Sequence, residues 1–166
     1  MTYTIEPARE EDLAELTALY LDYFDQLCDV GMNYELSRED LPEVLRGRIR
    51  SRLILAALAR TAEGTPAGFV FCSFLRISRE YRCCGESFIG YINDIYTVPA
   101  ARREGLAARL FRYAEDWLRA QGVTAVEAQI LSENRASLAF FSKLGLKPVN
   151  TTYFKTIEQE RKEPHD

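Results

Sequence analysis

The feature that most restricts the fold is an apolar stripe at helical spacing that directly follows a strand-like segment. Residues 88–98 are rich in isoleucine, tyrosine and valine, and Pro99 ends them, which predicts a strand. Within residues 105–121 apolar side chains recur at helical steps, at Leu106, Leu110, Ala114, Trp117 and Leu118. This spacing predicts one buried helix face, and Gly122 ends the helix. A strand followed by such a helix indicates a layered α/β fold.

The rest of the chain continues this mixture of strands and helices. Further strands are predicted at residues 2–6, 53–59, 67–77, 123–131 and 149–157, and further helices at residues 10–27, 37–49 and 132–143. Gly64 lies in the short turn between the second and third strands, so these two are expected to form a hairpin. The order predicts an α/β fold of the α+β type, with one mixed, mostly antiparallel sheet flanked by helices.

Length and composition indicate a single globular domain. The chain has 166 residues, of which 47% are hydrophobic and 28% charged. We therefore expect residues 1–157 to form one domain and residues 158–166 to form a charged C-terminal tail. The longest apolar run, residues 53–59, is far shorter than the roughly 20 residues of a membrane-spanning helix. Because residues 1–7 lack the basic and apolar regions of a signal peptide, we expect a cytoplasmic protein.

The distribution of charge says more than the total. A formal net charge of −4 is unlike the basic footprint of a protein that binds nucleic acid. Residues 1–50 contain 12 acidic and 5 basic side chains, whereas residues 51–166 contain 13 acidic and 16 basic ones. The acidic part would attract a cationic substrate and the basic part an anionic cofactor, although two differently solvated surfaces explain the pattern equally well.

The cysteines and the single histidine argue against a metal site and against a catalytic triad. Cys28, Cys72, Cys83 and Cys84 include no Cys-x-x-Cys pair, and His165 lies in the expected tail. We expect reduced thiols, and Cys72, within a predicted strand, is expected to be a small core residue.

The turn before the helix at residues 105–121 reads Arg-Arg-Glu-Gly-Leu-Ala over residues 102–107. The first turn of a helix has unpaired backbone N–H groups and about half a positive charge. Gly105 leaves room for a phosphate, and Arg102 and Arg103 add positive charge, which indicates an anion site, most naturally for a di- or polyphosphate. A plain helix start with a solvated basic turn is the alternative. Neither the Walker loop nor the three-glycine Rossmann pattern is present.

Two motifs, in order, resemble those of the GCN5-related N-acetyltransferase (GNAT) family. Residues 91–107, with Arg102-x-x-Gly105-x-Ala107, resemble its motif A, Gln/Arg-x-x-Gly-x-Gly/Ala. Residues 134–146 are similar to its motif B, in which an asparagine precedes an aromatic pair and a Lys-x-Gly-Phe ending, which reads Lys-Leu-Gly-Leu in this chain. The resemblance covers nearly the whole chain, and it implies a central sheet that splays open beside the motif A strand.

The resemblance implies acetyl-CoA as co-substrate and no metal. Backbone N–H groups of the motif A turn would hold the pyrophosphate, and the end of the preceding strand would pair with the pantetheine arm. The cofactor-binding residues implied in this way are Ile95, Tyr96, Thr97, Arg102, Arg103, Glu104, Gly105, Leu106, Ala107, Ala108 and Asn134. Asn134, at the start of motif B, would bond the pantetheine or polarise the site near the thioester.

The implied reaction is direct acetyl transfer to a primary amine of a small molecule or peptide. Asp94 is the candidate base for the amine proton, and a purely structural carboxylate is the alternative. The family commonly has a tyrosine acid at the position of Phe141, which has no proton to give. Tyr153, Ser137, Ser142 or water would then protonate the thiolate, and a CoA-binding sensor with little or no catalysis is the alternative function.

The acceptor pocket is implied near the helix at residues 10–27 and the loop to Glu35. Asp22, Asp25 and Asp29 either form a rim that recruits an amine or are simply solvated. No residue pattern identifies the acceptor. Dimers are frequent in the family, so a homodimer is expected, with neither nucleic acid nor a membrane as partner.

Overall fold

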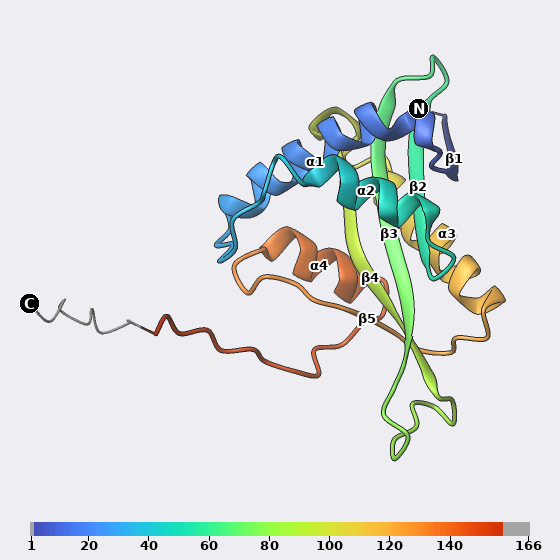
Figure 1. Ribbon diagram of the computed structural model, residues 1–166, viewed down its shortest axis with the longest axis vertical. Helices are drawn as coiled ribbons and strands as arrows, with labels where there is room; N and C mark the ends of the chain where they lie inside the picture. Colours follow the sequence, from blue (N-terminus) through green and yellow to red (C-terminus); the bar gives the residue numbers. More distant parts are fainter. Residues whose placement is uncertain (1, 158–166) are drawn as a thin grey trace, which may run out of the picture.

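The computed structural model describes residues 2–157, which form one five-stranded sheet with helices on both faces (Figure 1). The strands are β1 (Tyr3–Pro7), β2 (Ile54–Thr61), β3 (Pro66–Arg76), β4 (Phe88–Thr97) and β5 (Val126–Ala128). The helices are α1 (Leu13–Cys28), α2 (Leu41–Arg50), α3 (Leu106–Ala120) and α4 (Arg135–Lys143), with short 3₁₀ helices η1 (Glu10–Asp12) and η2 (Pro99–Ala101). The strand order is β1-β2-β3-β4-β5, and all neighbours are antiparallel except β4 and β5. The predicted fold class is confirmed.

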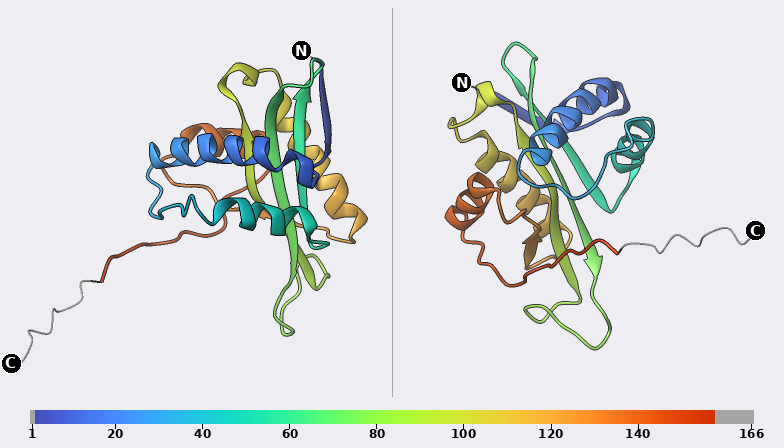
Figure 2. Two further views of the ribbon diagram at one scale, coloured as in Figure 1. Left: turned by 45° about the horizontal axis from the view of Figure 1, so that its top comes forward. Right: turned by 90° about the vertical axis from the view of Figure 1, so that its left-hand side faces the viewer.

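The sheet has a separate hydrophobic core on each face. Helices α1 and α2 cover one face, and α3 and α4 cover the other (Figure 2). Along β3 the side chains alternate, so Phe69 and Phe71 are buried under α1 and α2, whereas Val70 and Cys72 are buried on the α3 side. Cys72 is therefore the small core residue that its place in a strand predicts.

Helix α3 packs very close to β4, because Gly90 has no side chain. A Cβ atom at Gly90 would lie 2.8 Å from Cδ1 of Leu118, so any larger residue would have to displace that side chain. The short helix η2 joins the end of β4 to the turn before α3. Both ends of α3 are therefore placed relative to β4, and this fixes where the N-terminus of the helix lies.

A bulge in β4 decides which face its side chains point to. Phe71 of β3 pairs with Asp94 and Cys72 pairs with Ile92, so Asn93 has no partner of its own. As a result Ile92 lies in the α3 core, whereas Asp94 points to the α1 and α2 face. Tyr96, two residues further on, is buried on the same face as Asp94.

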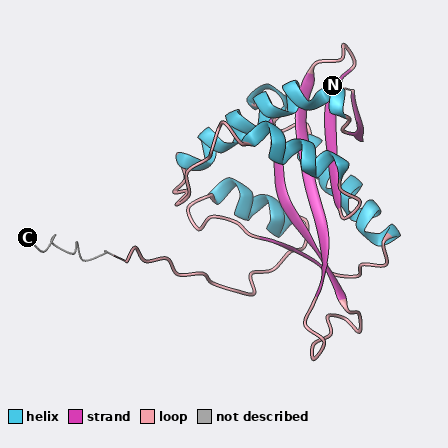
Figure 3. Cartoon of the chain, in the orientation of Figure 1, coloured by secondary structure: helices cyan, strands magenta, loops and turns pink. Residues whose placement is uncertain are grey.

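The strand predicted at residues 149–157 is wrong. Residues 147–157 form neither strand nor helix, and every one of them is exposed. They lead away from the body of the molecule as an extended stretch (Figure 3), and no backbone hydrogen bond joins them to any other described residue. A strand needs a neighbour for its N–H and C=O groups, and this stretch of the chain has none.

Smaller differences concern element ends. The helix predicted from residue 132 begins at Arg135, because the side chain of Asn134 accepts a hydrogen bond from the Ser137 N–H and caps it. The strand predicted at residues 123–131 is limited to β5, which pairs with only three residues of β4. The tail expected at residues 158–166 lies outside the described residues. Among those described, no helix has the length and apolar character needed to cross a membrane.

Candidate functional site

The sheet opens beside the second half of β4. On one side β4 pairs with β3 as far as Thr97, but on the other side β5 pairs only with Gly90, Tyr91 and Ile92. No strand of the described chain continues along Asn93–Thr97 on that side. The backbone of Ile95, Tyr96 and Thr97 therefore presents an open edge, which is the geometry that the GNAT resemblance implies.

The N-terminus of α3 lies just beyond this edge. Gly105 caps the helix in the left-handed conformation, with φ of 77°, and no atom lies within 4 Å of where its Cβ would be. Arg103 also has a left-handed backbone, with φ of 63°. A helix of 15 residues begins at Leu106, so its first backbone N–H groups, including those of Ala107 and Ala108, have no partner within the helix. Free donors at a helix start are the groups that bind a phosphate in many proteins.

The turn is tied to neighbouring elements by side chains. The Arg102 guanidinium donates to the Thr97 carbonyl over 3.3 Å and to the Gln26 side chain of α1. The Glu104 carboxylate accepts a hydrogen bond of 2.9 Å from the Tyr3 hydroxyl. The Arg109 guanidinium donates to the Tyr3 carbonyl over 2.7 Å. These bonds join the turn to β1, β4 and α1.

Asp94 lies in a polar cluster between β4 and the two helices above it. Its Oδ2 accepts from Arg48 Nη1 at 2.6 Å, and its Oδ1 accepts from the Tyr23 hydroxyl at 3.2 Å. The side chains of Arg48 and Asp94 are only 26% and 13% exposed. The Arg48 guanidinium also lies over the rings of Phe71 and Tyr20, at 4.8 and 5.5 Å from their centres. The carboxylate is therefore held in one position.

Burial changes the acid–base behaviour of the tyrosines around this cluster. Burial, and next the charge of Asp94, raise the pKa of Tyr23 well above its usual range. Burial, and next the hydrogen bond that its hydroxyl donates to Asp22, raise the pKa of Tyr96 to about 12. The Tyr96 hydroxyl also accepts from Gln26 Nε2 at 2.8 Å. Both tyrosines are therefore protonated hydrogen-bond donors at neutral pH.

The structure brings some of the predicted site residues together and leaves others apart. Asp94 and the turn at residues 102–108 lie near opposite ends of the open β4 edge. Asn134 uses its side-chain oxygen to cap α4. Phe141 is buried against Phe111 and Phe140. Tyr153 is 91% exposed, in the extended stretch at residues 147–157, so the single chain does not bring it to Asp94.

The predicted acidic rim on α1 is partly engaged within the chain. Asp22 is bonded to Tyr96, and Asp25 pairs with Arg38 at 2.7 Å on the exposed surface. Asp29 is exposed, and so is Glu35 in the following loop. Two of the three rim carboxylates therefore have partners already, and the exposed pair of Asp25 with Arg38 is weak enough to exchange for a ligand.

Arg48 is the principal residue that sequence reasoning missed. It follows Leu41 and Leu45 at steps of four and three residues, and both leucines are buried. This spacing puts Arg48 on the inward face of α2, where an arginine needs a buried anionic partner. The signal was present in the sequence, but only the structure shows that Asp94 is the partner.

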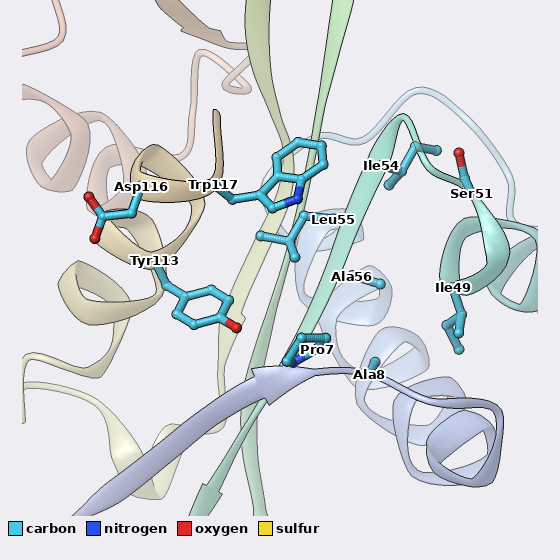
Figure 4. A pocket seen from close by; sticks show the side chains of 10 residues that line it. All are labelled: Pro7, Ala8, Ile49, Ser51, Ile54, Leu55, Ala56, Tyr113, Asp116 and Trp117. Carbon is cyan, nitrogen blue, oxygen red and sulfur yellow. The ribbon is translucent and has the colours of Figure 1, made fainter. Parts of the chain in front are cut away.

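A hollow of about 500 Å³ lies at the other edge of the sheet (Figure 4). Its lining includes Pro7 after β1, Ile54 of β2, and Tyr113 and Trp117 of α3. It is lined by neither the open edge of β4 nor the N-terminus of α3. The described residues include no group of three or more histidine, cysteine, aspartate or glutamate side chains that would hold a metal ion.

Comparison with known proteins decides the family. The profile of the acetyltransferase (GNAT) family matches residues 13–146, which is most of the chain. The chain belongs to the GNAT acetyltransferase family. It is 28% identical over 113 residues to an aminoglycoside N(6′)-acetyltransferase type 1 of Klebsiella aerogenes, a match that covers 68% of this chain and 71% of that one. Membership supports an N-acetyltransferase that uses acetyl-CoA, which confirms the prediction from the motifs.

A plant relative and two solved structures complete the comparison. The chain is 30% identical over 91 residues to the chloroplastic GCN5-related N-acetyltransferase 6 of Arabidopsis thaliana, but this match spans 55% of the chain and only 29% of that protein. The structure resembles the aminoglycoside 6′-N-acetyltransferase AAC(6′)-Ih of Acinetobacter baumannii, with a TM-score of 0.74, 21% identity and coverage of 95% and 100% of the two chains. It also resembles a predicted acetyltransferase solved with acetyl-CoA from Clostridium acetobutylicum, with a TM-score of 0.74, 15% identity and coverage of 93% and 96%. These two likenesses show the fold.

Proposed function

We propose that the protein transfers the acetyl group of acetyl-CoA directly to a primary amine of a small, cationic molecule, and that aminoglycosides are the acceptors to test first. The observation that carries the proposal is the open β4 edge at Asn93–Thr97, which leads to the free N–H groups at the start of α3. The open β4 edge suits the amide-containing pantetheine arm, and the N–H groups at the start of α3 suit a diphosphate. The aminoglycoside acetyltransferases among the relatives, and the acidic residues of α1, support a cationic acceptor.

The cofactor end of the site acts through the backbone. The N–H groups of residues 103–108, together with Arg102 and Arg103, would hold the negative charge of the diphosphate. The backbone of Ile95, Tyr96 and Thr97 would align the pantetheine arm as a neighbouring strand is aligned. When bound, acetyl-CoA supplies an acyl group activated as a thioester. Asn134, at the start of α4, would bond the pantetheine or polarise the site near that thioester.

The acceptor end acts through Asp94. An amine attacks only when it is neutral, so a base must take its proton, directly or through a water molecule. The contacts from Arg48 and Tyr23 fix the direction of the Asp94 carboxylate and leave it partly exposed. A backbone N–H of the same strand would stabilise the negative oxygen that develops as the amine adds to the thioester. A carboxylate that only holds α2 against β4 is the alternative role for Asp94.

The group that protonates the departing thiolate stays open. Phe141 has no proton to give, and Tyr153, Ser137, Ser142 and water are the candidates. The phenylalanine at position 141 is also the observation that favours the second candidate function, a CoA-binding sensor with little or no catalysis. The sensor would keep the open β4 edge and the α3 turn, but it would not turn over an acceptor.

We further propose that residues 1–157 act as one domain in the cytoplasm, without a nucleic-acid or membrane partner. The net charge of −4 supports the absence of a nucleic-acid partner, because nucleic-acid-binding domains are usually basic.

Calorimetric titration with acetyl-CoA, CoA and ATP, followed by release of free thiol across an amine panel, tests the proposed function. The panel contains aminoglycosides, polyamines, amino acids and peptide N-termini. We expect binding of acetyl-CoA and CoA, and thiol release with one or more aminoglycosides. Acetyl-CoA binding without turnover on any amine would favour the sensor. Binding of ATP without binding of CoA would remove the acetyl-CoA site.

A further inference from the structure

Gln26 is the single glutamine of α1, and its side chain lies between the turn before α3 and the end of β4. Its Oε1 accepts a hydrogen bond from the Arg102 guanidinium, and its Nε2 donates to the Tyr96 hydroxyl over 2.8 Å. The Tyr96 hydroxyl in turn donates to Asp22, which also belongs to α1. A chain of three hydrogen bonds therefore joins the proposed cofactor turn to the first helix.

The chemistry of the four side chains fixes the direction of each bond in this chain. A guanidinium has only donors, so the amide of Gln26 must turn its oxygen toward Arg102 and its nitrogen toward Tyr96. The Tyr96 hydroxyl accepts from that nitrogen, so its own proton points to the Asp22 carboxylate. Burial, and next this bond to Asp22, raise the pKa of Tyr96 to about 12, so the proton stays in place at neutral pH. The bonds therefore have a single arrangement.

Tyr96 is the fixed member of the chain of bonds. It is only 6% exposed, and the centre of its ring lies 5.8 Å from the ring centres of both Tyr23 and Phe69. Gln26 is half-buried, whereas Arg102 is exposed. A buried ring therefore orders a half-buried amide, and this amide orders an exposed guanidinium that would otherwise adopt many rotamers.

Arg102 keeps donors for a ligand while it is held. A guanidinium has five N–H groups, and the contacts with the Thr97 carbonyl and with Gln26 use two of them. The other three have no partner among the described residues. An arginine side chain loses much rotamer freedom when a ligand fixes it, and it loses less if the protein has fixed it beforehand. An arginine that is both anchored and unsaturated suits the binding of a diphosphate.

We propose that Gln26 is a positioning residue of the acetyl-CoA site, which holds the Arg102 guanidinium in place so that its remaining N–H groups meet the diphosphate. This role rests on the proposed function, because it requires acetyl-CoA at the start of α3. It adds a residue of α1 to a site that the motif A pattern assigns only to β4 and the turn after it. The helix that is expected to border the acceptor pocket thus also serves the cofactor.

Calorimetric titration of the full chain with acetyl-CoA tests this role. Gln26→Leu keeps a side chain of similar size but cannot accept from Arg102, so acetyl-CoA should bind roughly three- to tenfold more weakly. Tyr96→Phe keeps the buried ring but removes the anchor of the Gln26 amide, so it should weaken binding in the same direction. Gln121→Leu, at an exposed glutamine after α3, is the matched control and should leave the affinity unchanged. Unchanged or tighter binding by Gln26→Leu overturns the proposal.

A double variant shows whether Gln26 acts through Arg102. Arg102→Leu should itself weaken acetyl-CoA binding, and adding Gln26→Leu should cause no further loss, because the guanidinium that Gln26 holds is gone. Losses that add in the double variant would show that Gln26 acts through the packing of α1, and they overturn the proposal while the proposed function stands. If the unaltered chain binds neither acetyl-CoA nor CoA, the proposed function fails, and the role of Gln26 fails with it.

Discussion

The two ends of the open β4 edge are built from different chemical groups. At the α3 end, the candidate site consists of backbone N–H groups and a left-handed glycine, and side chains only tie the turn to its neighbours. At the Asp94 end, the candidate site consists of side chains from three elements, because Tyr23 of α1 and Arg48 of α2 both donate hydrogen bonds to Asp94 of β4. The first end therefore depends on chain conformation, whereas the second depends on the identity of several side chains at once.

This difference suggests which end can change during evolution. A backbone site accepts many side chains as long as the turn keeps its shape. A cluster of paired side chains accepts few single substitutions, because removing one member leaves a buried partner without its bond. We therefore expect mutations at the two ends to affect different measurements, and the following predictions test that separation.

The largest effect is expected for Asp94→Asn. If Asp94 is the base, kcat should fall about 100- to 10,000-fold and the acidic limb of the pH–rate profile should disappear, while acetyl-CoA affinity stays the same. Steady-state kinetics across pH with an active acceptor measure this. Asp116→Asn, at an exposed carboxylate paired with Arg119, is the control and should change nothing. A variant with an unaltered pH profile would return Asp94 to a structural role.

Next in size is the loss of stability in Arg48→Met. Removing the guanidinium leaves the mostly buried Asp94 carboxylate with Tyr23 alone, which should cost about 2–3 kcal/mol of unfolding free energy. Urea denaturation measures it, and Arg119→Met should cost almost nothing because its ion pair is exposed. Equal losses in the two variants would show that the buried pair contributes no more than a surface one.

Gly105→Glu addresses the backbone end. A carboxylate at the start of α3 would repel the diphosphate, so acetyl-CoA should bind roughly tenfold more weakly or worse, measured by calorimetry. Gly122→Glu is a matched control, because Gly122 has nearly the same φ, at 78°, and equally open space after the other end of α3. Weakening by both variants alike would indicate backbone strain rather than a phosphate site.

The smallest effect is a pH dependence of stability. Tyr96 has a pKa of about 12 in the folded chain and about 10 when unfolded, so folding favours its protonated form. Its contribution is complete below pH 10 and is lost as the pH rises toward 12. The melting temperature of Tyr96→Phe should therefore fall less steeply between pH 10 and pH 12 than the melting temperature of the unaltered chain. If the melting temperatures of the two proteins fell in parallel with pH, the pKa of Tyr96 would be the same in the folded and the unfolded chain.

The fold and the start of α3 could be predicted because their signals are local. The stripe through Leu106 and Leu110 and the glycine at position 105 are features of short segments. The end of α4 near Lys143 was predicted for the same reason. Local patterns of this kind predict the conformation of their own segment, and the order of the motifs then indicates the family.

The side-chain end could not be predicted, because its residues are far apart in the chain. Tyr23, Arg48 and Asp94 come from α1, α2 and β4, and only the folded structure shows their pairing. The strand expected at residues 149–157 failed for a related reason. A pattern reports preference for a conformation, but pairing requires a partner that the pattern does not contain.

The unpaired Asn93 makes the spacing along β4 as important as its composition. If β4 kept Asn93 but paired regularly onward from Ile92, Asn93 would lie opposite Phe71 and Asp94 opposite Val70. The carboxylate of Asp94 would then enter the apolar layer beneath α3, and Asn93 would take its place on the face of Arg48. Deleting Asn93 itself would leave Asp94 opposite Phe71, so this strand should tolerate the loss of its extra residue better than the loss of any paired residue before Asp94.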